Sequence, residues 1–338
     1  MRSTMKLLAA FGGVATLAVV ASGCAGGETS SAAAGDCAPV TLEVADSAPD
    51  QAWEDNLDGW SQRVSDGTDG RITVRIIPGG QLGGELEMVA QVKQGNLAMT
   101  QVGAPGFTEF TPLFTAYLFD DDKVMDFATS YIMQSWKDAI LEREGIRVLA
   151  VEYAPPRWIT SQTPIESPAD LSGLKIRVPE IPSLVEAFEA LGATPLALPW
   201  PDTYYALQTG AADGQENSAA VTDSGKIYEV QDYLAKTDHA QNFRYLLINE
   251  DTFQGICEGD REVLEGEIPQ LVADQEAQLR AESDELVQGW IDSGALQVTE
   301  PDISEFVEMV GDAGSDVAEE AWVPGVLEEI RAEYGPNS

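Results

Sequence analysis

Groups that carry out chemistry are rare in this chain of 338 residues. It contains one histidine, His239, and three cysteines, and its paired glycines at 79–80 and 83–84 do not follow the G-x-G-x-x-G spacing of a dinucleotide site. The sequence also lacks the G-x-S-x-G, H-E-x-x-H, phosphate-loop and C-x-x-C patterns of nucleophilic, zinc, nucleotide and redox sites. Because no nucleophile can be paired with a base, we expect a protein that is not an enzyme and uses no cofactor or metal.

Basic residues are scarce as well. The chain has 19 Lys and Arg against 57 Asp and Glu, which gives a formal net charge of −38. A surface this acidic repels the phosphates of nucleic acids and of anionic lipids, so we expect no nucleic-acid partner. An anionic ligand would gain nothing from long-range attraction, and the positive potential that holds it must therefore be local.

The chain has no apolar run long enough to cross a bilayer. Residues 7–20 are apolar, but these 14 residues fall short of the length of about 20 that a bilayer requires. Arg2 and Lys6 precede the run, and Ala21-Ser22-Gly23-Cys24 follows it with small residues before a cysteine.

This N-terminal pattern is typical of an exported lipoprotein. We interpret residues 1–23 as a lipoprotein signal peptide, Cys24 as the lipidated residue and residues 24–37 as a flexible tether. An ordinary secretory signal, cut near residues 32–34, is the alternative. The first interpretation predicts an extracytoplasmic monomer that is held at a membrane only by its lipid anchor.

Strand and helix patterns alternate along the rest of the chain. Strand patterns occur at 40–44, 72–77, 146–151, 157–161 and 243–249. Helical spacing is followed by Trp53, Leu57, Trp60 and Val64, and again by Leu86, Val89 and Val92. Strands separated by helices indicate an α/β architecture, and about 300 residues suffice for two lobes with a core each.

A long helical pattern begins the C-terminal third of the chain. From Asp260 to Trp290, leucine and isoleucine recur among many acidic and amide side chains, which predicts one long helix or two abutting helices. A helix of about 30 residues spans about 45 Å, which is longer than one lobe.

The best candidate for a binding residue is Arg177. Residues 174–178 alternate as in a strand that Pro179 ends, so Arg177 is the last side chain before the chain leaves the sheet. Ligands bind at such strand ends in open α/β sheets, and a guanidinium matches a carboxylate with two parallel hydrogen bonds. The residues alone also allow Arg177 to lie on a solvated strand face or in a structural ion pair.

Two further groups follow Arg177 in the same stretch. A second strand is expected to end at Pro-Trp-Pro (199–201), and a helix closed by Gly210 leads to a turn that carries Asn217. A cation, an aromatic plane and an amide are thus expected at the ends of neighbouring elements. That combination suits a small carboxylate.

Several blocks of the chain resemble one family. They are DLSGLKIRVP (170–179), EALGATPLALP (189–199), TYYALQTGAADGQEN (203–217), KIYEVQDYLAKTDH (226–239) and, upstream, GRITVRIIPGGQLGGELEMVAQVKQGNLAM (70–99). Their order and spacing are similar to those of the solute-binding proteins of TRAP transporters (tripartite ATP-independent periplasmic transporters, DctP type). The resemblance extends over most of the chain that follows the tether.

The resemblance implies a two-lobed, periplasmic-binding-protein-like α/β fold. A ligand cleft lies between the lobes, and the long helix runs along both. Strands near 150–157 and 241–249 would be the crossings, which makes each lobe discontinuous. Lobe I would comprise residues 38–154 and 243–283, and lobe II residues 155–242 and 284–338.

The resemblance also implies a function. Such a protein captures a small organic carboxylate and delivers it to the integral-membrane permease subunits of a TRAP transporter. Two alternatives stay open: a ligand-sensing subunit for a signalling partner, and a ligand that is zwitterionic or resembles an amino acid.

By position, the resemblance assigns roles to six residues. Arg177 would pair with the ligand carboxylate and Arg157 would be a second arginine at the cleft, while Asn217, Trp200, Tyr153 and Asp46 would line it. Two prolines precede Arg157 where the family commonly has glycine, so the pose of Arg157 is open.

Two further positions bear on the ligand. Gly103 stands where sialic-acid-binding relatives carry an acidic side chain, so sialic acid is not the expected ligand. Glu180, just after Arg177, is a candidate for contacting a hydroxyl or amine of the ligand, with an exposed turn carboxylate as the alternative.

With Cys24 lipidated, two cysteines remain. Cys37 immediately precedes the first strand and Cys257 follows the strand at 243–249, so both are expected in one lobe. In an oxidising compartment an even pair of this kind can form a disulfide, and two free thiols are the alternative.

The lipoprotein interpretation gives the first prediction. Replacing Cys24 with Ser should yield an intact, soluble protein that still binds its ligand, because only the anchor is lost. Sedimentation of the parent and of Cys24→Ser with membranes measures this. A variant that still sediments would place the anchor elsewhere.

Overall fold

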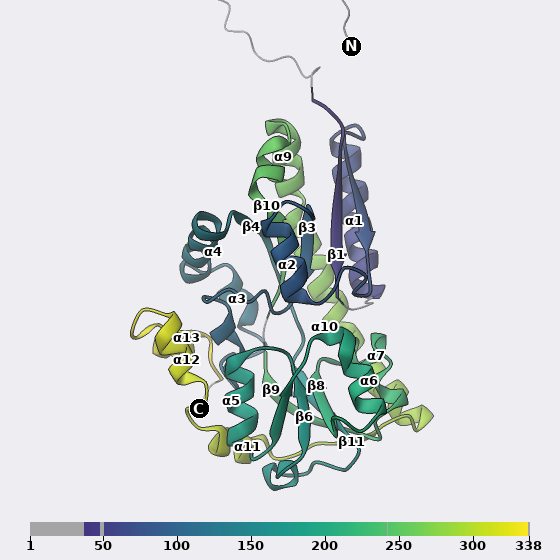
Figure 1. Cartoon of the computed structure of the whole chain (residues 1–338), viewed down its shortest axis with the longest axis vertical. Coiled ribbons are helices and arrows are strands. Elements are labelled where there is room, and N and C mark those ends of the chain that lie inside the picture. Colours follow the sequence, from purple (N-terminus) through teal and green to yellow (C-terminus); the bar gives the residue numbers. More distant parts are fainter. Residues whose placement is uncertain (1–36, 48–50, 242, 337–338) are drawn as a thin grey trace, which may run out of the picture. The chain divides into compact units, whose positions relative to one another are not determined.

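The computed structural model of this protein describes residues 37–47, 51–241 and 243–336. The chain from Cys37 onward forms one compact unit that contains two β-sheets (Figure 1). The expected signal peptide, Cys24 and the tether as far as residue 36 lie outside the described residues.

The first sheet is mixed. It contains β1 (Val40–Asp46), β2 (Ile72–Ile77), β3 (Met99–Val102), β4 (Ile146–Tyr153) and β10 (Phe243–Asn249) in the order β2-β1-β3-β10-β4. The helices beside it are α1 (Gln51–Gly67), α2 (Glu85–Lys93), α3 (Val124–Ala128), α4 (Tyr131–Glu144), α8 (Glu250–Gly255) and α9 (Glu258–Gly266). β1 pairs in parallel with β2 and β3, whereas β10 runs antiparallel to both of its neighbours.

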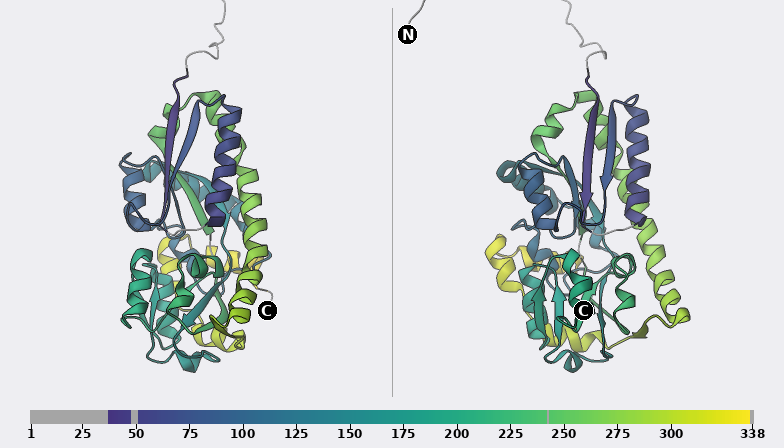
Figure 2. Two further views of the ribbon diagram at one scale, coloured as in Figure 1. Left: turned by 90° about the vertical axis from the view of Figure 1, so that its right-hand side faces the viewer. Right: turned by 45° about the vertical axis from the view of Figure 1, so that its right-hand side comes forward.

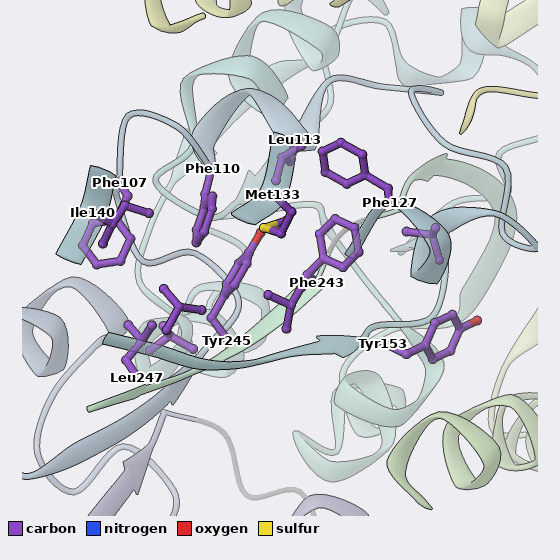
Figure 3. Packing of buried hydrophobic residues seen from close by; sticks show 14 of the residues in the cluster. Phe107, Phe110, Leu113, Phe127, Met133, Ile140, Tyr153, Phe243, Tyr245 and Leu247 are labelled. Atoms are coloured by element: carbon purple, nitrogen blue, oxygen red, sulfur yellow. The ribbon is translucent and has the colours of Figure 1, made fainter. Parts of the chain in front are cut away.

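Strand β10 shows that both faces of the first sheet are buried. Phe243, Tyr245 and Leu247 belong to an apolar cluster that includes residues of α2, α3 and α4 (Figure 3). Leu246 and Ile248 belong to a second cluster, formed with α1. Because successive side chains of a strand point to opposite faces, a strand buried on both faces is mostly apolar, and the charge of Arg244 within β10 is paired with Asp46.

The second sheet is also mixed. It contains β5 (Arg157–Ser161), β6 (Lys175–Val178), β7 (Thr194–Ala197), β8 (Gly214–Asn217), β9 (Tyr233–Ala240) and β11 (Gln297–Thr299) in the order β11-β9-β5-β8-β6-β7. Its helices are α5 (Pro182–Ala190), α6 (Thr203–Gln208), α7 (Ala219–Ser224) and α11 (Ile303–Val310). Trp158 packs into a cluster on the α7 side, and Ile159 into the cluster of α5 and α11.

Residues 214–217 correct one sequence prediction. They form a strand between β5 and β6, not the turn that their glycine and polar side chains suggested. The polar side chains are tolerated in the sheet because they have partners: Gln215 Nε2 donates to Thr160 Oγ1 at 3.0 Å, and Glu216 is bound by Arg157.

The chain passes between the sheets at the two predicted places and again through one helix. It leaves the first sheet after β4 and enters the second at β5, and it returns between β9 and β10. Helix α10 (Ile268–Ser293) then contacts α1 and β4 of the first part and α7 and β11 of the second (Figure 2). Its 26 residues span about 39 Å, which confirms a long helix along both parts.

The predicted helical stretch is divided into α9 and α10. The division falls at Glu267, and Pro269, which the prediction of this helical stretch overlooked, lies in the first turn of α10. Proline is favoured there because its missing N–H has no partner in a first turn anyway.

The C-terminal helices α12 (Ser315–Ala321) and α13 (Val326–Tyr334) pack beside the first sheet. Trp322 stacks on Trp136 with ring centroids 5.0 Å apart, and Tyr334 meets Phe127 edge-on at 5.2 Å. The division into lobes stays a prediction. It assigns the whole of 284–338 to lobe II, whereas α12 and α13 of this range pack against aromatic residues beside the first sheet.

A disulfide joins Cys37 to Cys257, with the two Cα atoms 5.8 Å apart. It ties the start of β1 to the first residue before α9, so both cysteines belong to the part built on the first sheet. Among the residues that the structure describes, we find no helix with the length and apolar character that a bilayer crossing requires.

Candidate ligand-binding cavity

A cavity of ≈ 100 Å³ is lined by residues from both sheets. Its walls are the ends of β1, β3, β6 and β8, the start of α2, the crossing between β4 and β5, and one residue of α10. Six residues that the sequence singled out line it: Arg177, Arg157, Asn217, Trp200, Asp46 and Glu180. The cavity therefore lies at strand ends, where the argument from Arg177 placed it.

Arg177 is held at the cavity by a backbone carbonyl. It is 2 % exposed, and its Nε and Nη2 donate to the carbonyl oxygen of Leu198 at 3.0 and 2.6 Å. Burial lowers the pKa of Arg177 to about 10, so the guanidinium is still charged at neutral pH. Because Nε and one proton of Nη2 are engaged, the edge formed by Nη1 and Nη2 is the part left to meet a carboxylate.

Trp200 lies beside this guanidinium. The Cζ atom of Arg177 is 5.7 Å from the Trp200 ring centroid, within the range of a cation–π interaction. Gly225 avoids a steric clash with the Trp200 ring, because a Cβ at that position would lie 2.5 Å from Cζ2 of Trp200. An aromatic plane and a cation thus share one wall.

Asn217 ends β8 on the adjoining wall. Its Oδ1 accepts a hydrogen bond from the backbone N–H of Ser218 at 3.0 Å. This contact fixes the amide and leaves Nδ2 as a donor at the cavity.

Arg157 has a different environment from Arg177. Its Nε and Nη2 donate to the two carboxylate oxygens of Glu216, at 2.5 and 2.8 Å, and Nε2 of His239 donates to the same carboxylate at 3.1 Å. Burial alone would raise the pKa of Glu216, but the charge and hydrogen bonds of Arg157, together with His239, lower it to about 2. The fork of Arg157 is thus engaged, and Nη1 is what remains for a ligand.

Asp46 lines the cavity as part of an ion pair. Nη2 of Arg244 donates to its Oδ2 at 2.6 Å, and both residues line the cavity. The sequence analysis missed Arg244, although an arginine within the apolar strand 243–249 was a usable signal. A charge in a central strand requires a buried partner.

Glu85 was also missed. It begins α2 and accepts hydrogen bonds from the backbone N–H groups of Gly103 and Ala104, at 2.7 and 3.1 Å. Glu85 therefore places a carboxylate beside Gly103, which has no side chain of its own. Glu180 lines the cavity as well, but its side chain is exposed.

The cavity does not include Tyr153. This residue is 2 % exposed, and its hydroxyl donates to Oδ1 of Asp121 at 2.7 Å. Figure 3 shows its ring at the end of the apolar cluster of the first sheet. The structure thus places the Tyr153 side chain outside this cavity, since a side chain at the end of a strand can point away from the cleft.

The two parts of the protein also touch beside the cavity. A Cβ on Gly84, just before α2, would lie 3.1 Å from Cβ of Pro199, and one on Gly80 would lie 3.2 Å from Cγ of Pro201. The turn at 78–84 therefore rests directly on the segment that carries Trp200.

An α/β protein with two sheets, three crossings and a cavity between strand ends that is lined by both charged and apolar side chains is a two-lobed binding protein. The chain belongs to the bacterial extracellular solute-binding protein family 7, DctP, whose model matches residues 44–320. This family consists of solute-binding proteins and not of enzymes.

Its relatives agree with this placement. A solute-binding protein of Roseobacter denitrificans is 33 % identical over 298 residues, which cover 86 % of this chain and 89 % of the relative. The sialic acid-binding periplasmic protein SiaP of Vibrio cholerae is 31 % identical, with coverage of 71 % and 76 %. The crystal structure of a TRAP periplasmic solute-binding protein of R. denitrificans with bound L-galactonate has a TM-score of 0.80 at 30 % identity, covering 87 % of this chain and 99 % of that one.

The buried pair of Arg157 and Glu216 gives a prediction about stability. Glu216→Gln leaves Arg157 buried without a counter-charge, so we expect the free energy of unfolding to fall by about 3–5 kcal/mol at neutral pH. The folded pKa of Glu216, about 2, is below its ordinary 4.5, so the stabilisation is present above pH 4.5 and is lost as the pH falls towards 2. The gap between parent and variant should close over that window.

Urea unfolding at a series of pH values measures this gap. Glu43→Gln is the matched control, since Glu43 pairs with Arg75 at the surface of the first sheet and should contribute less than about 1 kcal/mol. Equal effects of the two changes would contradict the prediction.

Proposed function

We propose that this protein captures a small organic carboxylate in the cavity between its two sheets, with Arg177 pairing with the carboxylate. The protein then delivers the ligand to the integral-membrane subunits of a TRAP-type permease. It does so from outside the cytoplasm, as a monomer that Cys24 anchors to the membrane through its lipid.

One observation carries the proposal. Two arginines of the described residues are buried, Arg157 and Arg177. Arg157 has the carboxylate of Glu216, whereas Arg177 has a carbonyl oxygen and an aromatic ring. A buried charge is costly unless it is paired. We therefore expect a ligand carboxylate to act as the negatively charged hydrogen-bond partner of Arg177.

The rest of the wall favours a ligand that also bears hydroxyl groups. Glu85 and the pair of Asp46 with Arg244 face the cavity, and carboxylates accept hydrogen bonds from hydroxyls. Asn217 adds a donor. A hydroxylated carboxylate, such as the L-galactonate bound by the relative of R. denitrificans, matches this mixture of charges.

Delivery to a permease rests on family membership and on the relatives that are periplasmic TRAP proteins. The N-terminal pattern that ends in Cys24 supports the anchor, which would keep the protein near such a permease.

The proposal predicts the effects of two changes at Arg177. A thermal-shift screen with L-galactonate, D-glucuronate and succinate first selects a ligand that binds the parent. Calorimetry should then show that Arg177→Ala weakens binding about 10²- to 10³-fold, because removing one member of a buried charge pair costs about 3–5 kcal/mol. Arg177→Lys should recover little, since an ammonium cannot reproduce two parallel hydrogen bonds.

Arg75→Ala, on the exposed strand β2, is the matched control and should bind as the parent does. Arg157→Ala should weaken binding less than Arg177→Ala, because one nitrogen of Arg157 remains for the ligand. It should also lower stability, because Glu216 loses its partner. If Arg177→Lys binds like the parent, or if Arg157→Ala is the more damaging change for binding, the assignment of the two arginines is wrong.

A further inference from the structure

One carboxylate, that of Asp121, contacts all three segments that pass between the sheets. Tyr153 ends β4 just before the first crossing, and Gln241 lies in the second crossing between β9 and β10. Arg280 lies near the middle of α10, the third. We name Asp121, Tyr153, Gln241 and Arg280 the Asp121 cluster.

The contacts within the cluster are direct. Oδ1 of Asp121 accepts hydrogen bonds from the Tyr153 hydroxyl at 2.7 Å and from Nε2 of Gln241. Oδ2 accepts from Nη1 of Arg280 at 2.5 Å, and the backbone carbonyl of Asp121 accepts from Nη2 of Arg280 at 3.0 Å. The guanidinium of Arg280 also lies 4.1 Å from the Tyr153 ring centroid. Tyr153, Gln241 and Arg280 thus all donate hydrogen bonds to Asp121, and Arg280 also packs against the Tyr153 ring.

The turn that carries Asp121 is held in place by hydrogen bonds to the first part of the fold. The neighbouring Asp120 donates its backbone N–H to the carbonyl oxygen of Tyr334 at 2.8 Å, and Nζ of Lys123 donates to the carbonyl oxygen of Gly335 at 3.1 Å. The end of α13, which packs into the aromatic cluster of the first sheet, therefore holds the turn that carries Asp121.

The cluster is separate from the cavity but adjoins it in sequence at two places. None of its four residues lines the cavity. Ala154, which follows Tyr153, and Leu279, which precedes Arg280, do line it. A shift of either segment at the cluster therefore also moves a residue of the cavity wall.

We propose that Asp121 is a positioning residue that holds the three crossing segments in the arrangement in which the two parts of the protein close over a ligand. It acts through Tyr153, Gln241 and Arg280 and does not contact the ligand. Without its carboxylate, the crossings lose their shared partner, and the population shifts towards open arrangements in which Gly84 no longer meets Pro199.

The effect on binding follows from the population of closed protein. Apparent affinity falls in proportion to the fraction of molecules that can bind. We expect Asp121→Ala to weaken binding about tenfold, with the cavity residues unchanged. Asp121→Asn keeps an oxygen for Tyr153 and Gln241 but loses the charge that Arg280 meets, so its effect should be intermediate.

The experiment measures the distance between the two parts directly. Spin labels are placed on cysteines at Ala90, exposed on α2, and at Gln208, exposed on α6, in a Cys24→Ser background with the native disulfide intact. Electron–electron resonance gives the distance distribution for the parent, Asp121→Ala and Asp121→Asn, each alone and with L-galactonate as the probe. Asp122→Ala is the matched control, because that neighbouring side chain is exposed and its carboxylate forms no hydrogen bond or ion pair with a described residue, while its backbone N–H bonds to Asp120 in either protein.

Asp121→Ala should give longer and broader distances than the parent, with Asp121→Asn between them and Asp122→Ala like the parent. Calorimetry on the same proteins should follow this order. A variant that melts at a lower temperature but keeps the parental distances and affinity would show a merely structural role and overturn the proposal, as would an equal shift in Asp122→Ala.

The affinity comparison rests on the proposed function, whereas the distances without ligand do not. If L-galactonate fails to bind even the parent, that probe is wrong, and the ligand-free distances decide. Longer distances in Asp121→Ala then support the proposal, and unchanged distances refute it.

Discussion

The buried guanidinium of Arg177, which forms no ion pair with any residue that the structure describes, is the constraint on which the cavity depends. Placing such a charge in a protein interior is unfavourable unless its surroundings stabilise it. The Leu198 carbonyl and the Trp200 ring do so in part. The chain as a whole is strongly acidic, with a net charge of −38, so the positive charge at the cavity comes from the arginines that line it, Arg157, Arg177 and Arg244. Under the proposed function, a ligand carboxylate completes the one interaction that the fold leaves open at Arg177.

The neighbouring Arg157 shows how the same side chain type acquires a different role. Both arginines end up at the cavity, one in β6 and one in β5, and both are buried. The strand between them, β8, brings Glu216 to Arg157, while Asn217, the next residue of that strand, lies at the cavity. Because alternate residues of a strand point to opposite faces, one short strand completes the ion pair of one arginine and adds a donor beside the other.

Much of this fold follows from local patterns in the sequence. The mostly apolar strand patterns at 146–151 and 243–249 became the buried strands β4 and β10, and helical spacing from Trp53 to Val64 became α1. Strand 214–217 could not be found in this way, because its polar residues are typical of a turn. They fit a buried strand only because Arg157 and Thr160 face them, and these partners cannot be identified from the local sequence. Glu85 escaped for the same reason, since its partners are backbone amides after β3. Arg244 could have been noticed as a charge within an apolar strand, but its partner, Asp46 of β1, is distant in sequence.

Tyr153 shows where similarity to a family stops being informative about a side chain. Similarity assigned Tyr153 to the lining of the cleft, whereas in the structure the direction of its side chain is decided by its partners. The hydroxyl meets Asp121, and the guanidinium of Arg280 covers the ring, so the side chain is drawn towards α10 and away from the cavity. The two residues at this strand end thereby face different parts of the molecule. Ala154 lines the cavity, while Tyr153 contacts α10, the helix that spans both parts. The wall of the cavity and the path of the chain between the sheets are therefore linked through the peptide bond between Tyr153 and Ala154.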